Sequence, residues 1–233
     1  MKIKKPFLAL FALAFIGLAA TQWRLAFTVV PIEEIQQRTL DETFDAAAYV
    51  DNVWESRILP TIVENAVDLS LVLSSFNPDE RGIAPKAELI EVVNEFGLIT
   101  VGEAHVYKIK GRGKVIEVDT ASRPAAIVVD LDGYDGSIKV RLYSGPRIPS
   151  DDTSIRDSVG FITFGDFREQ TEYGKVSTEL NRRVSANVLE KIDKDSLVGK
   201  TITFSGAFTL RTFNLIEIDL NKIFIVPVVL DVE

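Results

Sequence analysis

An uncharged stretch of 18 residues, 6–23, follows three lysines at the start of the chain and constrains the protein more than any other feature. At about 1.5 Å per helical residue this stretch is about 27 Å long, enough to cross the hydrocarbon core of a bilayer. The lysines favour a cytoplasmic N-terminus, so the rest of the chain is expected outside the cytoplasm. We therefore predict that residues 1–32 form a transmembrane or signal helix.

Two interpretations of this leader stay open. The stretch is longer than the about 7–15 apolar residues usual in a signal peptide, which favours an uncleaved signal anchor. The small residues Ala19 and Ala20 before Thr21 are typical of a cleavage site, and cleavage would release the protein from the membrane. Both interpretations place the folded part outside the cytoplasm.

The composition excludes several classes of function. The chain has no cysteine and one histidine, His105, which rules out disulfides, iron–sulfur clusters, thiolate chemistry and multi-histidine metal sites. The formal net charge of −8 argues against nonspecific binding of nucleic acid. One basic cluster surrounds two glycines and is predicted to line a solvated strand edge: Lys108, Lys110, Arg112 and Lys114. We expect no nucleic-acid partner, no metal and no cofactor.

Residues 33–98 are predicted to form a helical extension after a polar connector. Apolar residues recur at three- and four-residue steps from Phe44 to Phe76, which is typical of one buried helix face. Pro60 is expected to break this segment and to start a second helix. A third helix is expected to begin at Pro85 and to end at Gly97 as its C-cap.

Residues 99–233 are predicted to form an OB-like five-stranded β-barrel. Four β-rich runs are separated by glycine, proline and Asp-Gly turns: 101–107, 115–119, 125–131 and 138–143. Glycines at 111 and 113 indicate that the first two runs form one long bent strand, which serves both sheets of a barrel.

The remaining elements give the barrel its order. Val176, Leu180 and Val184 recur at four-residue spacing and predict a helix, which is followed by strands over 201–210 and 222–232. Five strands with a helix between strands 3 and 4 is the order of an OB fold. The predicted fold class is therefore α+β, and a plain antiparallel sandwich is the alternative.

The irregular stretch 145–170 is the candidate binding loop, because it is longer than ordinary connections. Three phenylalanines recur in it at every third residue, and their alternative role is a plug that closes one end of the barrel. The candidate ligand-binding residues are Arg156, Phe161, Phe164, Asp166, Phe167 and Asn181.

No catalytic residues are predicted, and the protein is expected not to be an enzyme. His105 lies on a predicted strand, without a nucleophile motif near it, and is interpreted as a strand residue facing solvent or a neighbour. The alternative function is a hydrolase that uses Asp166 with Glu169 or Glu172, since carboxylate pairs are recognised by geometry rather than spacing.

Several segments together resemble the uncharacterised bacterial family of predicted periplasmic lipoproteins (domain of unknown function 2291). The resemblance covers about residues 28–232, and four segments carry it: 44–50 with Trp54, 111–115, 156–167 and 199–208. Thr21 stands where a lipobox requires cysteine, so attachment of a lipid is not expected here.

The resemblance implies an accessory role beside a sugar ABC importer or its binding protein. We therefore expect a membrane-anchored extracytoplasmic binding or accessory protein. It is expected in the bacterial inner membrane facing the periplasm, or free in the periplasm if the leader is cleaved. The further alternative is a purely structural protein that docks on a membrane partner.

Overall fold

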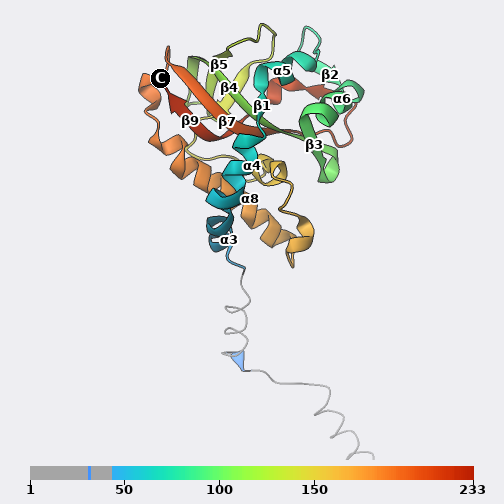
Figure 1. Ribbon diagram of the computed structural model, residues 1–233, viewed down its shortest axis with the longest axis vertical. Helices are drawn as coiled ribbons and strands as arrows, with labels where there is room; N and C mark the ends of the chain where they lie inside the picture. The colour runs from blue at the N-terminus through green and yellow to red at the C-terminus, as the bar shows by residue number, and fades with distance from the viewer. Residues whose placement is uncertain (1–30, 33–43) are drawn as a thin grey trace, which may run out of the picture. The chain divides into compact units, whose positions relative to one another are not determined.

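A mixed α/β architecture, built around one mainly antiparallel sheet, is seen in the computed structural model, which describes residues 31–32 and 44–233 (Figure 1). Its main strands lie side by side in the order β6-β5-β4-β7-β9. These strands are β4 (Ala104–Asp119), β5 (Ala126–Leu131), β6 (Val140–Tyr143), β7 (Thr201–Leu210) and β9 (Val226–Val232). The sequence prediction of five strands with a helix between the third and the fourth is confirmed, because α8 (Gln170–Asn187) lies between β6 and β7.

Strand β4 is the long bent strand that the two glycines predicted. It pairs with β7 along its first part and with β5 along its last part, with a bulge between Val115 and Glu117. A Cβ on Gly111 would lie 2.8 Å from the Phe204 ring, and one on Gly113 would overlap the Asp130 carbonyl oxygen. The glycines therefore allow neighbouring strands and rings to approach the bend closely.

The predicted closed barrel is wrong, since the sheet remains open. Its two end strands, β6 and β9, approach each other through a single parallel bridge between Leu142 and Ile225. The Ile225 N–H donates to the Arg141 carbonyl oxygen at 2.8 Å, and the Tyr143 N–H donates to Ile225 at 3.0 Å. Strand β6 has four residues and β9 carries Pro227, which has no N–H, so the two edges offer little further pairing.

The first helical segment differs from the prediction at Pro60. Helix α3 (Ala46–Val53) continues through a π-helical turn, η1 (Trp54–Ile58), into α4 (Leu59–Glu64) without a break. Pro60 is the second residue of α4, directly after the π-helical turn, and the helix continues through it. The side chains of Trp54 and Ile58 are buried.

The predicted helix over 60–76 is interrupted by a short strand. Strand β1 (Val67–Asp68) pairs in parallel with β4, with Val67 opposite Ile109. Helix α5 (Leu69–Ser75) then begins with Asp68 as its N-cap, whose carboxylate accepts from the Ser70 N–H at 2.9 Å. The buried apolar residues of α5 and α6 then pack in one core with those of the sheet.

The hydrophobic core lies between the sheet and the helices α5 and α6 (Lys86–Phe96). Phe76 contacts the rings of Tyr107 and Phe208 edge-on, and the last two rings stack at 4.9 Å. Helix α6 ends at Gly97, as predicted, but this glycine has an extended backbone rather than a left-handed one. Its role is close approach, because a Cβ there would lie 2.7 Å from the Val106 carbonyl oxygen.

The smaller elements complete the chain. Strands β2 (Ile83–Pro85) and β8 (Glu217–Asp219) form a separate antiparallel pair, and β3 (Gly97–Thr100) pairs with the start of β4. Short helices are η2 (Val101–Glu103), α7 (Ser154–Ser158), η3 (Phe164–Asp166), η4 (Leu189–Lys191), η5 (Lys194–Ser196) and η6 (Leu220–Lys222). Residues 45–233 form one compact unit.

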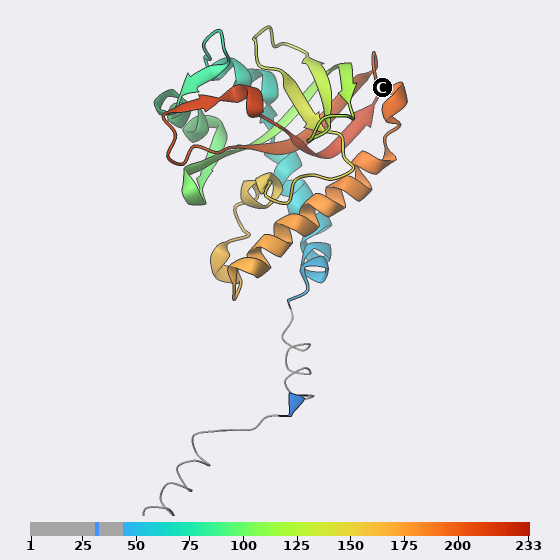
Figure 2. The ribbon, with the colours of Figure 1, turned by 180° about the vertical axis from the view of Figure 1, so that it is seen from behind.

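A helical layer of α3, α4 and α8 lies on the side of the sheet away from β5 and its hairpin (Figures 1 and 2). Helix α8 buries Val176, Leu180 and Val184, which confirms the four-residue spacing as its inward face. The Asp51 carboxylate of α3 pairs with Arg183 of α8, whose guanidinium lies 5.7 Å from the Trp54 ring. The helix that leaves residue 45 is therefore fixed to α8.

The predicted membrane helix lies in residues 1–32, nearly all of which are outside the described residues. Across 31–32 and 44–233, no helix combines the length and the apolar character that crossing a bilayer requires.

Candidate functional site

The segment 145–170 contains the predicted binding residues, but the structure gives several of them internal partners. Arg156, on α7, is 8% exposed, and its Nε–H donates to Asp157 at 2.8 Å. Its guanidinium also lies 3.6 Å from the centre of the Tyr173 ring. Asp157 further accepts from the Thr153 hydroxyl at 2.6 Å. Arg156 therefore belongs to a packed network between α7 and α8.

The three phenylalanines lie on the helical layer rather than over an end of the sheet, so the barrel-plug interpretation is wrong. Phe161 lies under the Arg57 guanidinium at 3.7 Å, and Phe167 packs edge-on against Tyr49 of α3 at 5.5 Å. Phe164 is 51% exposed and contacts Tyr173 of α8 edge-on at 5.8 Å. Their three-residue spacing serves to join α3, η1 and α8.

Asp166 acts as a local cap. Its carboxylate accepts from the Thr163 N–H and hydroxyl, both at 2.9 Å, and closes a capping box around η3. These two hydrogen bonds lower the pKa of Asp166 below its ordinary value. Glu172 accepts from the Arg168 N–H at 2.9 Å, and Glu169 accepts from the Thr171 hydroxyl at 3.0 Å. Each carboxylate of the hydrolase alternative is thus engaged in hydrogen bonds of its own loop or helix turn.

Asn181 holds the candidate loop on α8. Its side chain is 4% exposed, and its Nδ2 donates to the carbonyl oxygens of Pro149 at 3.1 Å and Asp152 at 2.8 Å. Because one amide group joins two points of the loop to one helix, residues 149–152 are fixed across α8.

A groove of about 890 Å³ lies where this loop crosses α8. One wall comes from residues 146–150, another from Arg123 and Pro124 just before β5, and the floor from α8. We call it the arginine groove, and its lining includes Arg123, Arg147, Ile148, Asn181, Arg182, Ser185, Ala186 and Glu190. Asn181 is the one predicted site residue in this lining, and the other five predicted residues lie elsewhere among the described residues.

Sequence reasoning missed Arg123, Arg147 and Ser185. The two arginines each adjoin a proline, and they flank the hairpin of β5 and β6. Ala126 pairs with Tyr143 in that hairpin, so continuing the register places residue 123 opposite residue 146. The antiparallel register of the β5–β6 hairpin could therefore have indicated that the two arginines lie close together. Ser185 is a single serine on a helix, and nothing in the sequence marks it.

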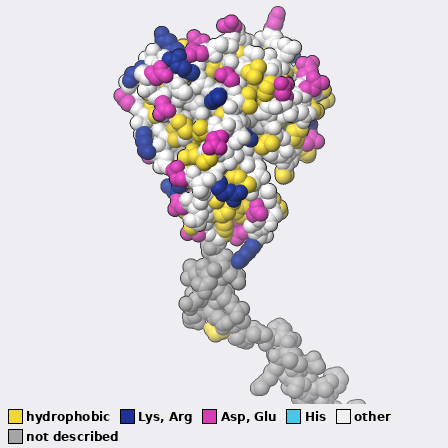
Figure 3. Space-filling view, viewed as in Figure 1, with side chains coloured by type: hydrophobic (Ala, Val, Ile, Leu, Met, Phe, Trp, Pro, Cys, Tyr) yellow, Lys and Arg dark blue, Asp and Glu magenta, His cyan; other side chains and the backbone are white. Residues whose placement is uncertain are grey.

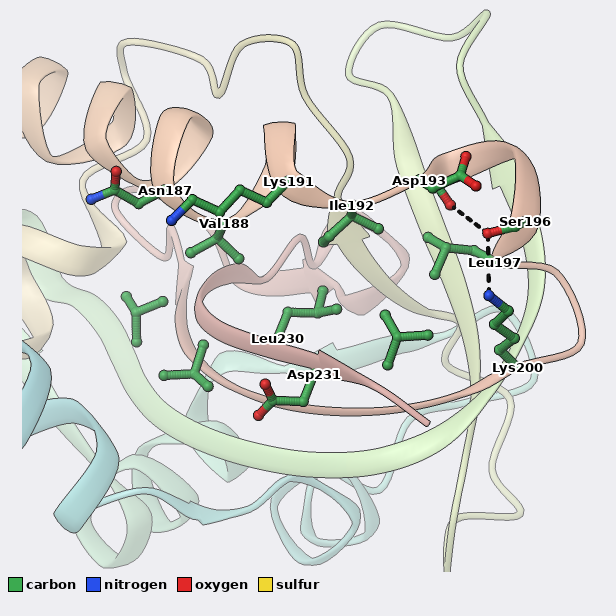
Figure 4. A pocket seen from close by; sticks show the side chains of 13 residues that line it. Asn187, Val188, Lys191, Ile192, Asp193, Ser196, Leu197, Lys200, Leu230 and Asp231 are labelled. Carbon is green, nitrogen blue, oxygen red and sulfur yellow. Dashed lines mark hydrogen bonds between the residues drawn. The ribbon is translucent and has the colours of Figure 1, made fainter.

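A second groove, of about 490 Å³, lies between β9 and the connection from α8 to β7 (Figure 4). Two of its polar side chains are paired, since the Lys200 ammonium donates to Ser196 and the Ser196 hydroxyl donates to the Asp193 carbonyl oxygen, both at 3.2 Å. The side chains of Ile192 and Leu230 also line it. Its lining carries two lysines and two aspartates, so it lacks the excess of positive charge that the arginine groove has.

His105 is buried in β4. Of the two orientations expected for it, facing solvent is therefore wrong, and facing a neighbouring residue remains. It is 1% exposed and lies opposite Ile99 of β3 and Leu210 of β7. Figure 3 accordingly shows no histidine on the face that it draws. Burial, with the nearby Lys86 ammonium, lowers the pKa of the imidazole. No hydrogen-bond partner of its Nδ1 is found among the described residues. A buried neutral imidazole is thus part of the core.

The basic cluster does not line a sheet edge, because β4 is the central strand. The Lys108 ammonium donates to the Ser158 carbonyl oxygen at 3.2 Å, and burial lowers its pKa. Arg112 forms salt bridges with Asp132 at 2.9 Å and Glu233 at 2.6 Å. These contacts tie β4 to its neighbours.

The Asp-Gly turns connect the antiparallel strands β5 and β6, as a hairpin does. In the part of the chain that the structure describes, no three histidine or acidic side chains come together as possible metal ligands.

The family model described as "Predicted periplasmic lipoprotein (DUF2291)" matches residues 12–231. The match spans nearly the whole chain, which therefore belongs to this family. The family description indicates an extracytoplasmic location.

One solved structure with a similar fold is a crystal structure of an OB-fold protein from Thermotoga maritima. Its TM-score is 0.60 at 19% sequence identity, over 82% of this chain and all of that chain. At this identity the likeness shows the fold alone. Among curated proteins, none matches this chain.

Proposed function

We propose that this member of the predicted periplasmic lipoprotein family is a membrane-anchored accessory protein that binds a small extracytoplasmic ligand in the arginine groove. The observation that carries this proposal is the Asn181 clamp. It holds residues 149–152 across α8 with two hydrogen bonds, so that the groove wall is pre-formed rather than mobile. Pre-formed concave sites are typical of small-molecule binding.

The resemblance of the sequence to its family adds a partner to this proposal. We infer that the protein works beside a sugar ABC importer or its binding protein, with the N-terminal leader as the membrane anchor. Helix α3 supports this arrangement, because it begins where the leader-side chain enters the compact unit and is fixed to α8 by the Asp51–Arg183 ion pair. Helix α8 therefore contacts α3 and also forms the floor of the groove.

The partner is tested by placing a photocrosslinking residue at Ser150, on the rim of the groove, in the full-length protein in native membranes. Lys139 is the matched control, because it is also exposed but does not line the groove. We expect crosslinks to an importer subunit or its binding protein from position 150 and not from position 139. Crosslinks that are equal at both positions, or none from position 150, would contradict the proposal.

The hydrolase alternative is tested in the same preparation. An Asp166→Ala variant is expected to keep the crosslinks of the parent protein, since Asp166 lies in the capping box of η3 and not in the groove. Loss of glycoside turnover in this variant, with crosslinks retained, would favour the hydrolase over the binding module.

A further inference from the structure

Two arginines without partners line the arginine groove. Neither Arg123 nor Arg147 forms a side-chain hydrogen bond or ion pair within residues 44–233, whereas Arg182 on the same groove pairs with Glu179 at 2.6 Å. The remaining acidic side chain in the lining is Glu190. The free charge of the groove is therefore positive, in a chain whose formal net charge is −8.

The hairpin of β5 and β6 brings these two cations together from distant parts of the sequence. Its register pairs Ala126 with Tyr143, and the Ser144 N–H donates to the Ala125 carbonyl oxygen at 3.1 Å just beyond the last pair. The next residues of both strands then leave the sheet at the same end. Arg123 and Arg147 are therefore presented at one mouth of the groove.

The floor of the groove supplies a free polar group. Ser185 is 6% exposed, lines the groove and has no hydrogen-bond partner for its hydroxyl in the described chain. A serine hydroxyl in a helix often donates to the carbonyl oxygen four residues earlier, and no such bond exists here. The adjoining side chains of Ile148 and Ala186 are apolar. The groove thus combines a cationic mouth, one free hydroxyl and an apolar patch.

We propose that the arginine groove binds a small organic anion, with a carboxylate or phosphate group held by Arg123 and Arg147 and with its hydroxyl-bearing body against Ser185. Guanidinium groups suit this role, because their planar N–H donors match the oxygens of carboxylate and phosphate. The inference rests on the proposed function and specifies its ligand class. Gluconate and glucose 6-phosphate are hydroxyl-bearing members of this class, one with a carboxylate and one with a phosphate.

The test is calorimetric titration of the full-length protein in detergent micelles with gluconate, glucose 6-phosphate and glucose. We expect at least one of the two anions to bind, with an affinity that falls as salt is added, and glucose to bind at least ten-fold more weakly. Arg123→Gln and Arg147→Gln should each weaken anion binding at least ten-fold, and Ser185→Ala about three-fold. Lys139→Gln, which removes one positive charge outside the groove, should change the affinity less than two-fold.

The outcomes separate this inference from the proposed function. One outcome is that glucose and the anions bind with equal affinity and that Ala186→Trp, which fills the groove, abolishes binding of all three. This result would overturn the anionic ligand class but keep the groove as the binding site. Binding by neither anion would also overturn the anionic class. If Ala186→Trp leaves binding unchanged, the proposal that the arginine groove is the binding site would be overturned. Melting temperatures of the variants show whether each one is folded.

Discussion

Replacing Asn181 with alanine tests the structural basis of the groove. The substitution removes the hydrogen bonds to the carbonyl oxygens of Pro149 and Asp152, both made by a side chain that is almost fully buried. Each bond contributes about 1 kcal/mol net, and the partly buried acceptors lose their donor, so we expect the free energy of unfolding to fall by about 2–3 kcal/mol. For a domain of this size that corresponds to a melting temperature lower by about 4–12 °C.

The assay is thermal unfolding of the full-length protein, followed by far-UV circular dichroism. Asn187→Ala is the matched control, because Asn187 is an exposed asparagine on the same helix, and we expect its melting temperature to stay within about 1 °C of the parent. The wall of the groove should also loosen, which faster hydrogen exchange of residues 149–152 in Asn181→Ala would report. Equal melting temperatures for the two variants would refute the clamp.

Three further predictions concern the buried histidine and two glycines. Because the pKa of His105 is lowered in the folded state, the unfolded chain takes up a proton that the folded chain lacks as pH falls below the ordinary value of 6.5. The melting temperature should therefore fall from about pH 7 to about pH 5.5 in the parent protein, and less in His105→Gln; parallel curves would contradict this reasoning. Gly113→Ala should lower the free energy of unfolding by about 1–3 kcal/mol, because the new Cβ overlaps the Asp130 carbonyl oxygen, and denaturant titration measures it. Gly174→Ala, where a Cβ on α8 meets open space, should instead raise that free energy by about 0.5–1 kcal/mol, and a loss there would show that the helix tolerates no added side chain.

The sequence predicted the order of the main elements because that order depends on local patterns. Val176, Leu180 and Val184 recur at helical spacing and are the buried face of α8. The glycines at 111 and 113 marked the bend of β4. Strands β1 and β3 were missed, because two or four residues that pair with a distant strand leave no periodic signal of their own.

The candidate site was harder to predict, because residue type does not reveal which partners a side chain already has. Arg156 and Asp166 have the charge of ligand-binding groups, but each is engaged by neighbours on its own loop or on α8. Asn181 was predicted as a ligand contact; it lines the groove, and its amide also positions the groove wall. Arg123 and Arg147 emerge once the register of β5 and β6 is known.

The π-helical turn at Trp54–Ile58 sets the rotational phase of the helix that begins at Ala46. Val50, Trp54, Ile58 and Ile62 are all buried at four-residue spacing, which in a regular α-helix would rotate the buried face by about 120° from first to last. One inserted residue removes about 100° of that rotation, so the four side chains keep a common direction. Deleting one residue within 54–58 would turn Asp51 and Tyr49 away from their partners. The extra residue of the π-helical turn thus keeps the buried side chains of α3 and α4 aligned. If the turn moved by a few residues along the helix, α3 would rotate about the helix axis while α4 kept its contacts with the sheet.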